Sequence, residues 1–132
     1  MNINRKIYSS SNTVKKYSKQ NFIFPEEFFL MNHIEKMKES NLTFLDIGVG
    51  AGRTTLHFKD KCQYYIGLDY SKPMIEYCRN KFRNVKNCIF FDSDACKMNS
   101  LKDNSVNIAL FSFNGIDYVS LETRRNILRE VQ

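Results

Sequence analysis

Three glycines at alternate positions, preceded by an aspartate, form the stretch of this sequence with the clearest chemical meaning. Gly48, Gly50 and Gly52 follow an apolar, strand-like run over residues 43–47, and Asp46 lies inside that run. Glycines at this spacing let the backbone turn sharply and approach a ligand closely, because no Cβ atom blocks either move. A strand, a glycine-rich turn and a helix in that order indicate a nucleotide-type site at the carboxyl end of a parallel strand.

The spacing of the glycines excludes two common nucleotide-binding loops. The dinucleotide fingerprint requires a third glycine three residues after the second, and Arg53 occupies that position. The phosphate-binding loop is also excluded, because no Gly-Lys-Ser/Thr sequence follows the glycines.

A second acidic residue lies where a ribose-binding carboxylate is expected. Asp69 ends another strand-like run, residues 64–69, and follows the last glycine at close to the roughly 20-residue spacing typical of that role. A carboxylate there can accept hydrogen bonds from both ribose hydroxyls. Taken alone, Asp69 could instead cap the helix that Ser71 and Pro73 are expected to begin.

The remaining segments predict an α/β fold. Strands are expected at residues 88–91 and 106–111, and helices at residues 25–39, from residue 71 onward and from about residue 121. This alternation implies a parallel sheet with right-handed crossovers.

The Asp-x-Gly-x-Gly-x-Gly run and the segments that follow it resemble the class I S-adenosylmethionine-dependent methyltransferases over roughly residues 40–132. The resemblance implies a three-layer Rossmann-like parallel sheet, of which strands 1–4 are present. It also implies S-adenosyl-L-methionine as the cofactor and methyl transfer as the reaction.

The resemblance further implies positions for the cofactor. Asp46, Gly48 and Gly50 would surround its methionine part, and Asp69 would hold the ribose hydroxyls. The adenine would be lined by Tyr70, Met74, Asp94 and the backbone of Ala95. The reaction side would be lined by Phe111, Ser112 and Asn114. Alone, the glycines could form only a tight turn and Asp94–Ala95 only a loop; their order and spacing favour the site.

The positive charge is concentrated at the N-terminus. Residues 1–20 carry Arg5, Lys6, Lys15, Lys16 and Lys19 without any acid, which accounts for +5 of the net charge of +6. A basic tail of this kind is usually solvated, although it could contact RNA phosphates. In many relatives an N-terminal segment with a tyrosine covers the cofactor, so residues 1–20 are read as a tail or lid and residues 21–132 as the binding domain. The lid candidates are Tyr17 and Tyr8.

Composition indicates a cytoplasmic protein without a metal site. No apolar stretch approaches the roughly 18 residues of a membrane span. The four cysteines show no C-x-x-C spacing and are expected to be reduced thiols.

The acceptor of the methyl group is not named by any motif. No general base is evident, although Asp117 and Tyr118 follow the fourth predicted strand. The Asn/Asp-Pro-Pro-Tyr signature of enzymes that methylate base or amide nitrogens is absent. A small-molecule acceptor is therefore expected, with an RNA methyltransferase or a non-catalytic cofactor-binding domain as alternatives.

The family's sheet order is 3-2-1-4-5-7-6, and only four strands are visible here. We expect either that this chain is the N-terminal part of such a domain or that it forms a homodimer through the exposed edge of the fourth strand.

Overall fold

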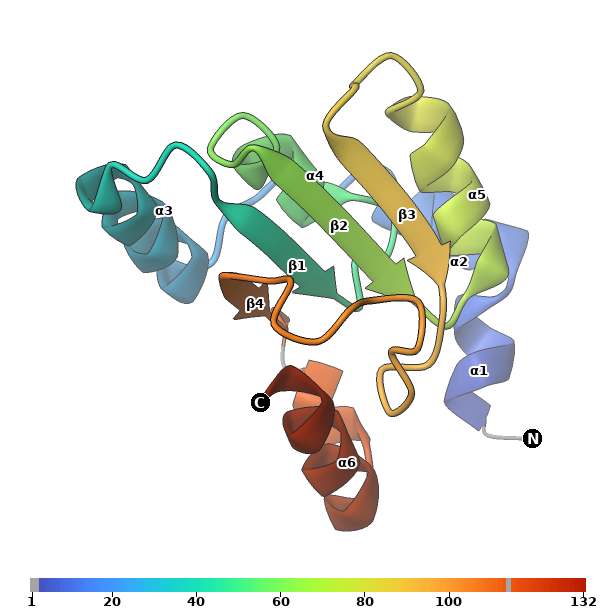
Figure 1. The fold of residues 1–132 in the computed structure, drawn as a ribbon. Coiled ribbons are helices and arrows are strands. Elements are labelled where there is room, and N and C mark those ends of the chain that lie inside the picture. Colours follow the sequence, from blue (N-terminus) through green and yellow to red (C-terminus); the bar gives the residue numbers. More distant parts are fainter. Residues whose placement is uncertain (1–2, 114) are drawn as a thin grey trace.

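The computed structural model describes residues 3–113 and 115–132, and these residues form an α/β fold around a four-stranded sheet (Figure 1). The strands are β1 (Thr43–Ile47), β2 (Tyr64–Asp69), β3 (Cys88–Asp92) and β4 (Ile108–Leu110). Every pairing is parallel, and the strand order is β3-β2-β1-β4. This order confirms the predicted Rossmann-like class.

The register brings the carboxyl ends of the strands to one edge of the sheet. Ile47, the last residue of β1, is paired with Leu68, and Asp69 at the end of β2 is paired with Asp92. The arrowheads in Figure 1 accordingly point to a common edge, beyond which α1 (Ile3–Tyr8) and α6 (Leu121–Val131) lie. Loops that follow different strands therefore meet there.

One face of the sheet is covered by three helices: α3 (Pro25–Met37), α4 (Arg53–Phe58) and α5 (Lys72–Lys81). Their buried side chains share one apolar cluster with Phe44, Tyr65 and Phe90 of the strands. The Phe44 and Phe58 rings stack with centroids 4.7 Å apart, which fixes the short helix α4 against β1. The predicted helix over residues 25–39 ends at Met37, because Lys38 adopts a φ of 52°.

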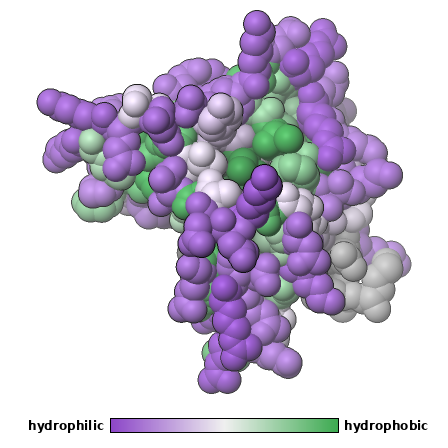
Figure 2. Space-filling view, viewed as in Figure 1, coloured by the Kyte–Doolittle hydropathy of each residue, from purple (hydrophilic) through white to green (hydrophobic). Residues whose placement is uncertain are grey.

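The opposite face is partly covered by the connection between β3 and β4, residues 93–107, which contains no helix. A second cluster joins Leu45, Ile47 and Leu68 to Met98, which lies in the connection between β3 and β4. This connection crosses only part of the face, and Figure 2 shows apolar residues gathered in the middle of this side between hydrophilic margins. Parallel strands need both faces covered, and here a loop contributes to the second layer.

The N-terminal segment is folded. It forms α1 and α2 (Ser11–Tyr17), and the Ser10 side chain caps α2 by accepting a hydrogen bond from the Thr13 N–H at 3.2 Å. The Ser71 hydroxyl donates to the Tyr8 carbonyl at 2.8 Å, which joins the end of α1 to the start of α5. The described part of the predicted tail is thus helical and is joined to the domain.

No helix within residues 3–113 and 115–132 combines the length and the apolarity needed to cross a lipid bilayer.

Candidate functional site

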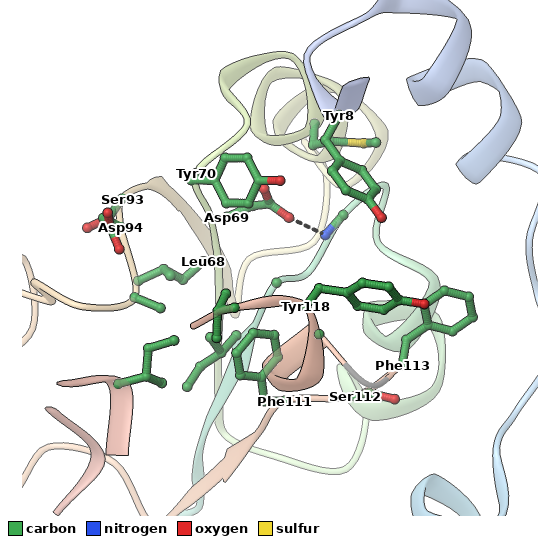
Figure 3. A pocket seen from close by; sticks show the side chains of 18 of the residues that line it. Tyr8, Leu68, Asp69, Tyr70, Ser93, Asp94, Phe111, Ser112, Phe113 and Tyr118 are labelled. Carbon is green, nitrogen blue, oxygen red and sulfur yellow. Dashed lines mark hydrogen bonds between the residues drawn. The ribbon is translucent and has the colours of Figure 1, made fainter. Parts of the chain in front are cut away.

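A cavity of about 420 Å³ lies at the carboxyl ends of the strands (Figure 3). Its volume falls within the roughly 300–1,000 Å³ typical of sites for small organic ligands. Nine residues predicted for the site line it: Tyr17, Gly48, Gly50, Asp69, Tyr70, Met74, Asp94, Ala95 and Phe111. Tyr8 and Ser112, also named from the sequence, line it as well. Asn114 lies outside the described residues.

The glycine loop adopts a left-handed backbone conformation at Gly50 and Gly52, and it leaves open space at Gly50. Gly50 has a φ of 54°, and a Cβ atom built on it would meet no protein atom within 4 Å. Gly52 has a φ of 77°, and its Cβ would lie 2.5 Å from Cε2 of Phe82. Both positions require the left-handed conformation that glycine adopts readily. Only at Gly50 does the missing side chain leave open space, and Gly50 lines the cavity.

Asp69 is tied to the glycine loop. Its Oδ2 accepts a hydrogen bond from the Gly50 N–H at 2.9 Å, and its Oδ1 accepts one from the Ser71 N–H at 2.8 Å. Burial raises the pKa of the Asp69 carboxyl, although these backbone hydrogen bonds oppose the shift. A carboxylate has about four acceptor sites. The side chain therefore helps to begin α5 and keeps acceptor capacity for a ligand.

Asp46 does not line the cavity, which differs from the position expected for it. Its Oδ2 accepts hydrogen bonds from the hydroxyls of Thr54 and Tyr65 beneath the glycine loop. Burial raises the pKa of this carboxyl to about 7, against the opposing effect of the two hydrogen bonds. In this structure Asp46 anchors the first turn of α4 to β1 and β2.

Asp94 lines the cavity at its outer end. Its Oδ1 accepts a hydrogen bond from the Cys96 N–H at 2.9 Å, a local turn contact, while the side chain remains exposed. Figure 3 shows Asp94 and Phe113 at opposite ends of the cavity. Asp94 therefore makes the local contact of a loop residue and also lines the cavity, as predicted.

Aromatic rings form one wall of the cavity. The Tyr8 ring lies 5.9 Å from Tyr17 and 6.4 Å from Tyr70, and the Tyr17 ring lies 6.4 Å from Phe113. Burial and the hydrogen bond with Tyr8 raise the pKa of Tyr17 to about 12. The rings span from the end of β2 to the loop after β4, so α1 and α2 cover the cavity with side chains of both helices.

Phe113 was not predicted for the site. It follows β4 with a φ of 61°, a strained conformation that costs a non-glycine residue about 1–3 kcal/mol and persists only where the surroundings fix it. Its ring also contacts Phe24 at 5.3 Å. The signal in the sequence was an aromatic residue in the loop after the fourth strand. Of the two base candidates there, Tyr118 lines the cavity, and Asp117 lies 3.5 Å from Arg124 instead.

A buried ion pair beside this wall was also missed. Arg53 Nη1 donates to Oε2 of Glu27 at 2.7 Å, and Nη2 donates to Oε1 at 2.5 Å. The Ser112 hydroxyl also donates to Oε1 of Glu27. Burial opposes the charge on Glu27, but the hydrogen bonds from Arg53, Ser112 and the Phe24 N–H hold its pKa below the usual value. Glu27 is therefore an anion at neutral pH.

The described residues that line the cavity include acidic side chains but no Lys, Arg or His. Asp69 and Asp94 line it, whereas no Lys, Arg or His does so in residues 3–113 and 115–132. The same ranges contain no group of three or more potential metal-ligating side chains.

Comparison with known proteins places residues 44–132 in a family described as a methyltransferase domain. A stretch of 70 residues is 27% identical to an uncharacterized methyltransferase of Schizosaccharomyces pombe, covering 53% of this chain and 25% of that protein.

Solved structures of other proteins share the fold, and two of them illustrate the likeness. The YcgJ protein from Bacillus subtilis is 28% identical with a TM-score of 0.66, over 82% of this chain and 45% of that one. A putative S-adenosyl-L-methionine-dependent methyltransferase from Methanococcus maripaludis is 18% identical with a TM-score of 0.76, over 99% and 61%. This chain thus spans less than two thirds of each of these proteins.

Proposed function

This chain belongs to the methyltransferase-domain family, and on that premise we propose that it binds S-adenosyl-L-methionine and serves methyl transfer to a small-molecule acceptor. The cofactor supplies a methyl group on a sulfonium, whose leaving group is a neutral thioether. The protein's part is to hold the acceptor in line with that methyl and to exclude water.

The observation that carries the proposal is the contact between Gly50 and Asp69 at the cavity. At this contact the open space over Gly50 lies beside the Asp69 carboxylate, which keeps acceptor capacity for a ligand. Such a pair fits a ligand that brings a bulky group to the loop and hydroxyl donors to the acid, as a nucleoside does.

The N-terminal segment, residues 1–20, acts in this proposal as a lid over the cofactor, and residues 21–132 form the binding domain. The support is the position of Tyr8 and Tyr17, which line the cavity from α1 and α2. Closure of such a segment excludes water from the reacting atoms.

The charge of the cavity favours an uncharged or cationic acceptor. A phosphate or carboxylate on the acceptor would find no basic side chain among the described lining residues. Glu27 is engaged by Arg53, and the phenol of Tyr17, with a pKa of about 12, is a weak proton acceptor at neutral pH. The acceptor we propose therefore needs no strong base from this chain.

An RNA acceptor is the competing function, and exposed lysines favour it. Lys15 and Lys16 on α2 are exposed next to Tyr17, and no ion pair involves them among the described residues. An anionic polymer held there would bind with strong salt dependence.

Two further parts of the proposal concern the protein in its cell. We assign it to the cytoplasm, where its four free cysteines would stay reduced.

We also propose a homodimer through the exposed edge of β4, which has only β1 as a neighbour in the described sheet. Light scattering at several protein concentrations tests the dimer.

The acceptor class is tested by supplying methyl-labelled cofactor to the protein with separated small-molecule and RNA fractions of cells. Label entering the small-molecule fraction, with little dependence on salt, is the expected result. Label entering RNA and falling steeply with salt would replace this proposal by the competing one. Cofactor binding without transfer to either fraction would favour a non-catalytic binding domain.

A further inference from the structure

The buried ion pair between Glu27 and Arg53 joins parts of the chain that border the cavity from different directions. Glu27 lies in the first turn of α3, Arg53 begins α4 directly after Gly52, and Ser112 follows β4. Glu27 is fully buried, and Arg53 is 8% exposed. Of the three, only Ser112 lines the cavity.

Arg53 also holds the segment that leads from the N-terminal helices into α3. Its Nη1 donates to the Phe22 carbonyl at 2.7 Å. Its guanidinium carbon lies 4.9 Å from the centre of the Phe22 ring and 5.0 Å from that of Phe24. Arg53 therefore fixes both the backbone and the rings of this segment, five residues beyond Tyr17.

The rings of Phe22 and Phe24 also support Phe113, the residue with a strained backbone in the loop after β4. Phe22 and Phe24 contact Phe113 at 6.3 Å and 5.3 Å. The neighbouring Ser112 is held by Glu27 through its hydroxyl. Figure 3 shows Ser112 and Phe113 together at the end of the cavity away from Asp94. The φ of 61° at Phe113 is thus maintained by contacts on both its ring and its preceding residue.

We propose that Glu27, Arg53 and Ser112 form a positioning unit that holds two parts of the cavity in one arrangement: the loop after β4, from which Ser112 and Phe113 line the cavity, and the N-terminal lid. This inference rests on the proposed function, because it takes the cavity to hold the cofactor and residues 1–20 to cover it. The unit leaves the Gly50–Asp69 contact untouched, so its loss affects closure more than cofactor binding.

A guanidinium is needed for this role. Arg53 uses a planar fork toward Glu27, donates to a carbonyl and lies between two rings. A lysine keeps the charge but offers neither the fork nor the planar surface. Arg53→Lys is therefore the first variant to test.

The test is trypsin cleavage after Lys15, Lys16 and Lys19, with and without S-adenosylhomocysteine, beside calorimetric titration of the same ligand. Cleavage follows the population of the open segment when opening is fast. In the wild-type protein we expect the ligand to slow cleavage about tenfold. In Arg53→Lys we expect the ligand to bind within about tenfold of wild type and the protection to disappear.

Two further variants separate positioning from stability. Replacing a buried ion pair by apolar residues is often neutral or stabilising, so Glu27→Met with Arg53→Met removes the hydrogen bonds while filling the space. Ser112→Ala removes only the link to the loop after β4, and it is expected to fold and to lose part of the protection. Thermal unfolding of each variant identifies those that are folded at the assay temperature.

Arg79→Lys is the matched control. Arg79 also donates to a carbonyl, that of Phe90 at 2.7 Å, and lies 3.5 Å from Asp92, so its hydrogen bonds and its ion pair go to β3 rather than to residues of the lid, and Arg79→Lys is expected to keep full protection. Full protection in all the folded variants of Glu27, Arg53 and Ser112 would overturn the inference, as would a wild-type protein that binds the ligand without any protection. A wild-type protein that does not bind the ligand would instead overturn the proposed function itself.

Discussion

The backbone N–H of Gly50 donates a hydrogen bond of 2.9 Å to Oδ2 of Asp69. This contact joins the middle glycine of the loop after β1 to the acid that ends β2, 19 residues further along the chain. Because β1 and β2 are parallel neighbours, the two residues reach the same edge of the sheet, where the cavity lies. The proposed cofactor site is built on this contact.

Substitution at Gly50 should affect ligand binding more than folding. Gly50→Ala places a methyl group in open space, so we expect a loss of only about 1–2 kcal/mol in the free energy of unfolding, from the φ of 54°. The methyl would occupy the ligand's side of the loop, so S-adenosylhomocysteine should bind at least about tenfold more weakly. Calorimetry and urea unfolding measure the two effects.

Gly52→Ala is the control for this substitution. Its methyl would lie 2.5 Å from Cε2 of Phe82, so this variant should be the less stable of the two. The interpretation of the loop would be contradicted if Gly50→Ala bound the ligand as well as the wild type does.

The sequence predicted the parts of the site that depend on local pattern. The glycine loop and Asp69 were recognisable because strand, turn and acid follow one another within a short stretch. The partners of Asp46 were not, since Tyr65 is 19 residues away and only the β1–β2 pairing brings its hydroxyl there. The Glu27–Ser112 contact joins residues 85 apart, and the strained Phe113 is contacted by the rings of Tyr17, Phe22 and Phe24, which lie about 90 or more residues earlier in the chain. Such contacts follow from tertiary packing, which a single sequence does not display.

Asp46 should make stability depend on pH. Burial raises the pKa of its carboxyl to about 7, whereas an unfolded aspartate titrates near 4. Between these values the folded state binds more protons than the unfolded state does. The free energy of unfolding should therefore fall as the pH rises from about 4 to about 7, by on the order of 2–4 kcal/mol from this group.

Asp46→Asn provides the comparison, because an amide oxygen can still accept from Thr54 and Tyr65. Urea unfolding of both proteins between pH 5 and pH 8 should show a decline in the wild type that is shallower in the variant. Asp69, whose pKa is also raised, contributes equally to both proteins, so parallel profiles would show that Asp46 is not the source.

The ring of Tyr17, rather than its hydroxyl, should carry its contribution to the lid. Tyr17→Phe keeps the contacts with Tyr8 and Phe113, so S-adenosylhomocysteine affinity should stay within about threefold of wild type. Tyr17→Ala removes both edge contacts, each worth about 0.5–1.5 kcal/mol, and should weaken binding about fivefold to a hundredfold. Equal affinities of the two variants would contradict the assignment of residues 1–20 as a lid.

The central claim is tested most directly by calorimetric titration of this chain with S-adenosyl-L-methionine and S-adenosylhomocysteine, beside Asp69→Ala. Asp92→Ala is the matched control, since Asp92 ends the neighbouring strand in register with Asp69 but is exposed. The account predicts that both ligands bind the wild type and the control alike, and that Asp69→Ala loses most of this affinity while remaining folded. Undiminished binding by Asp69→Ala, or no binding by the folded wild-type protein, would contradict the account.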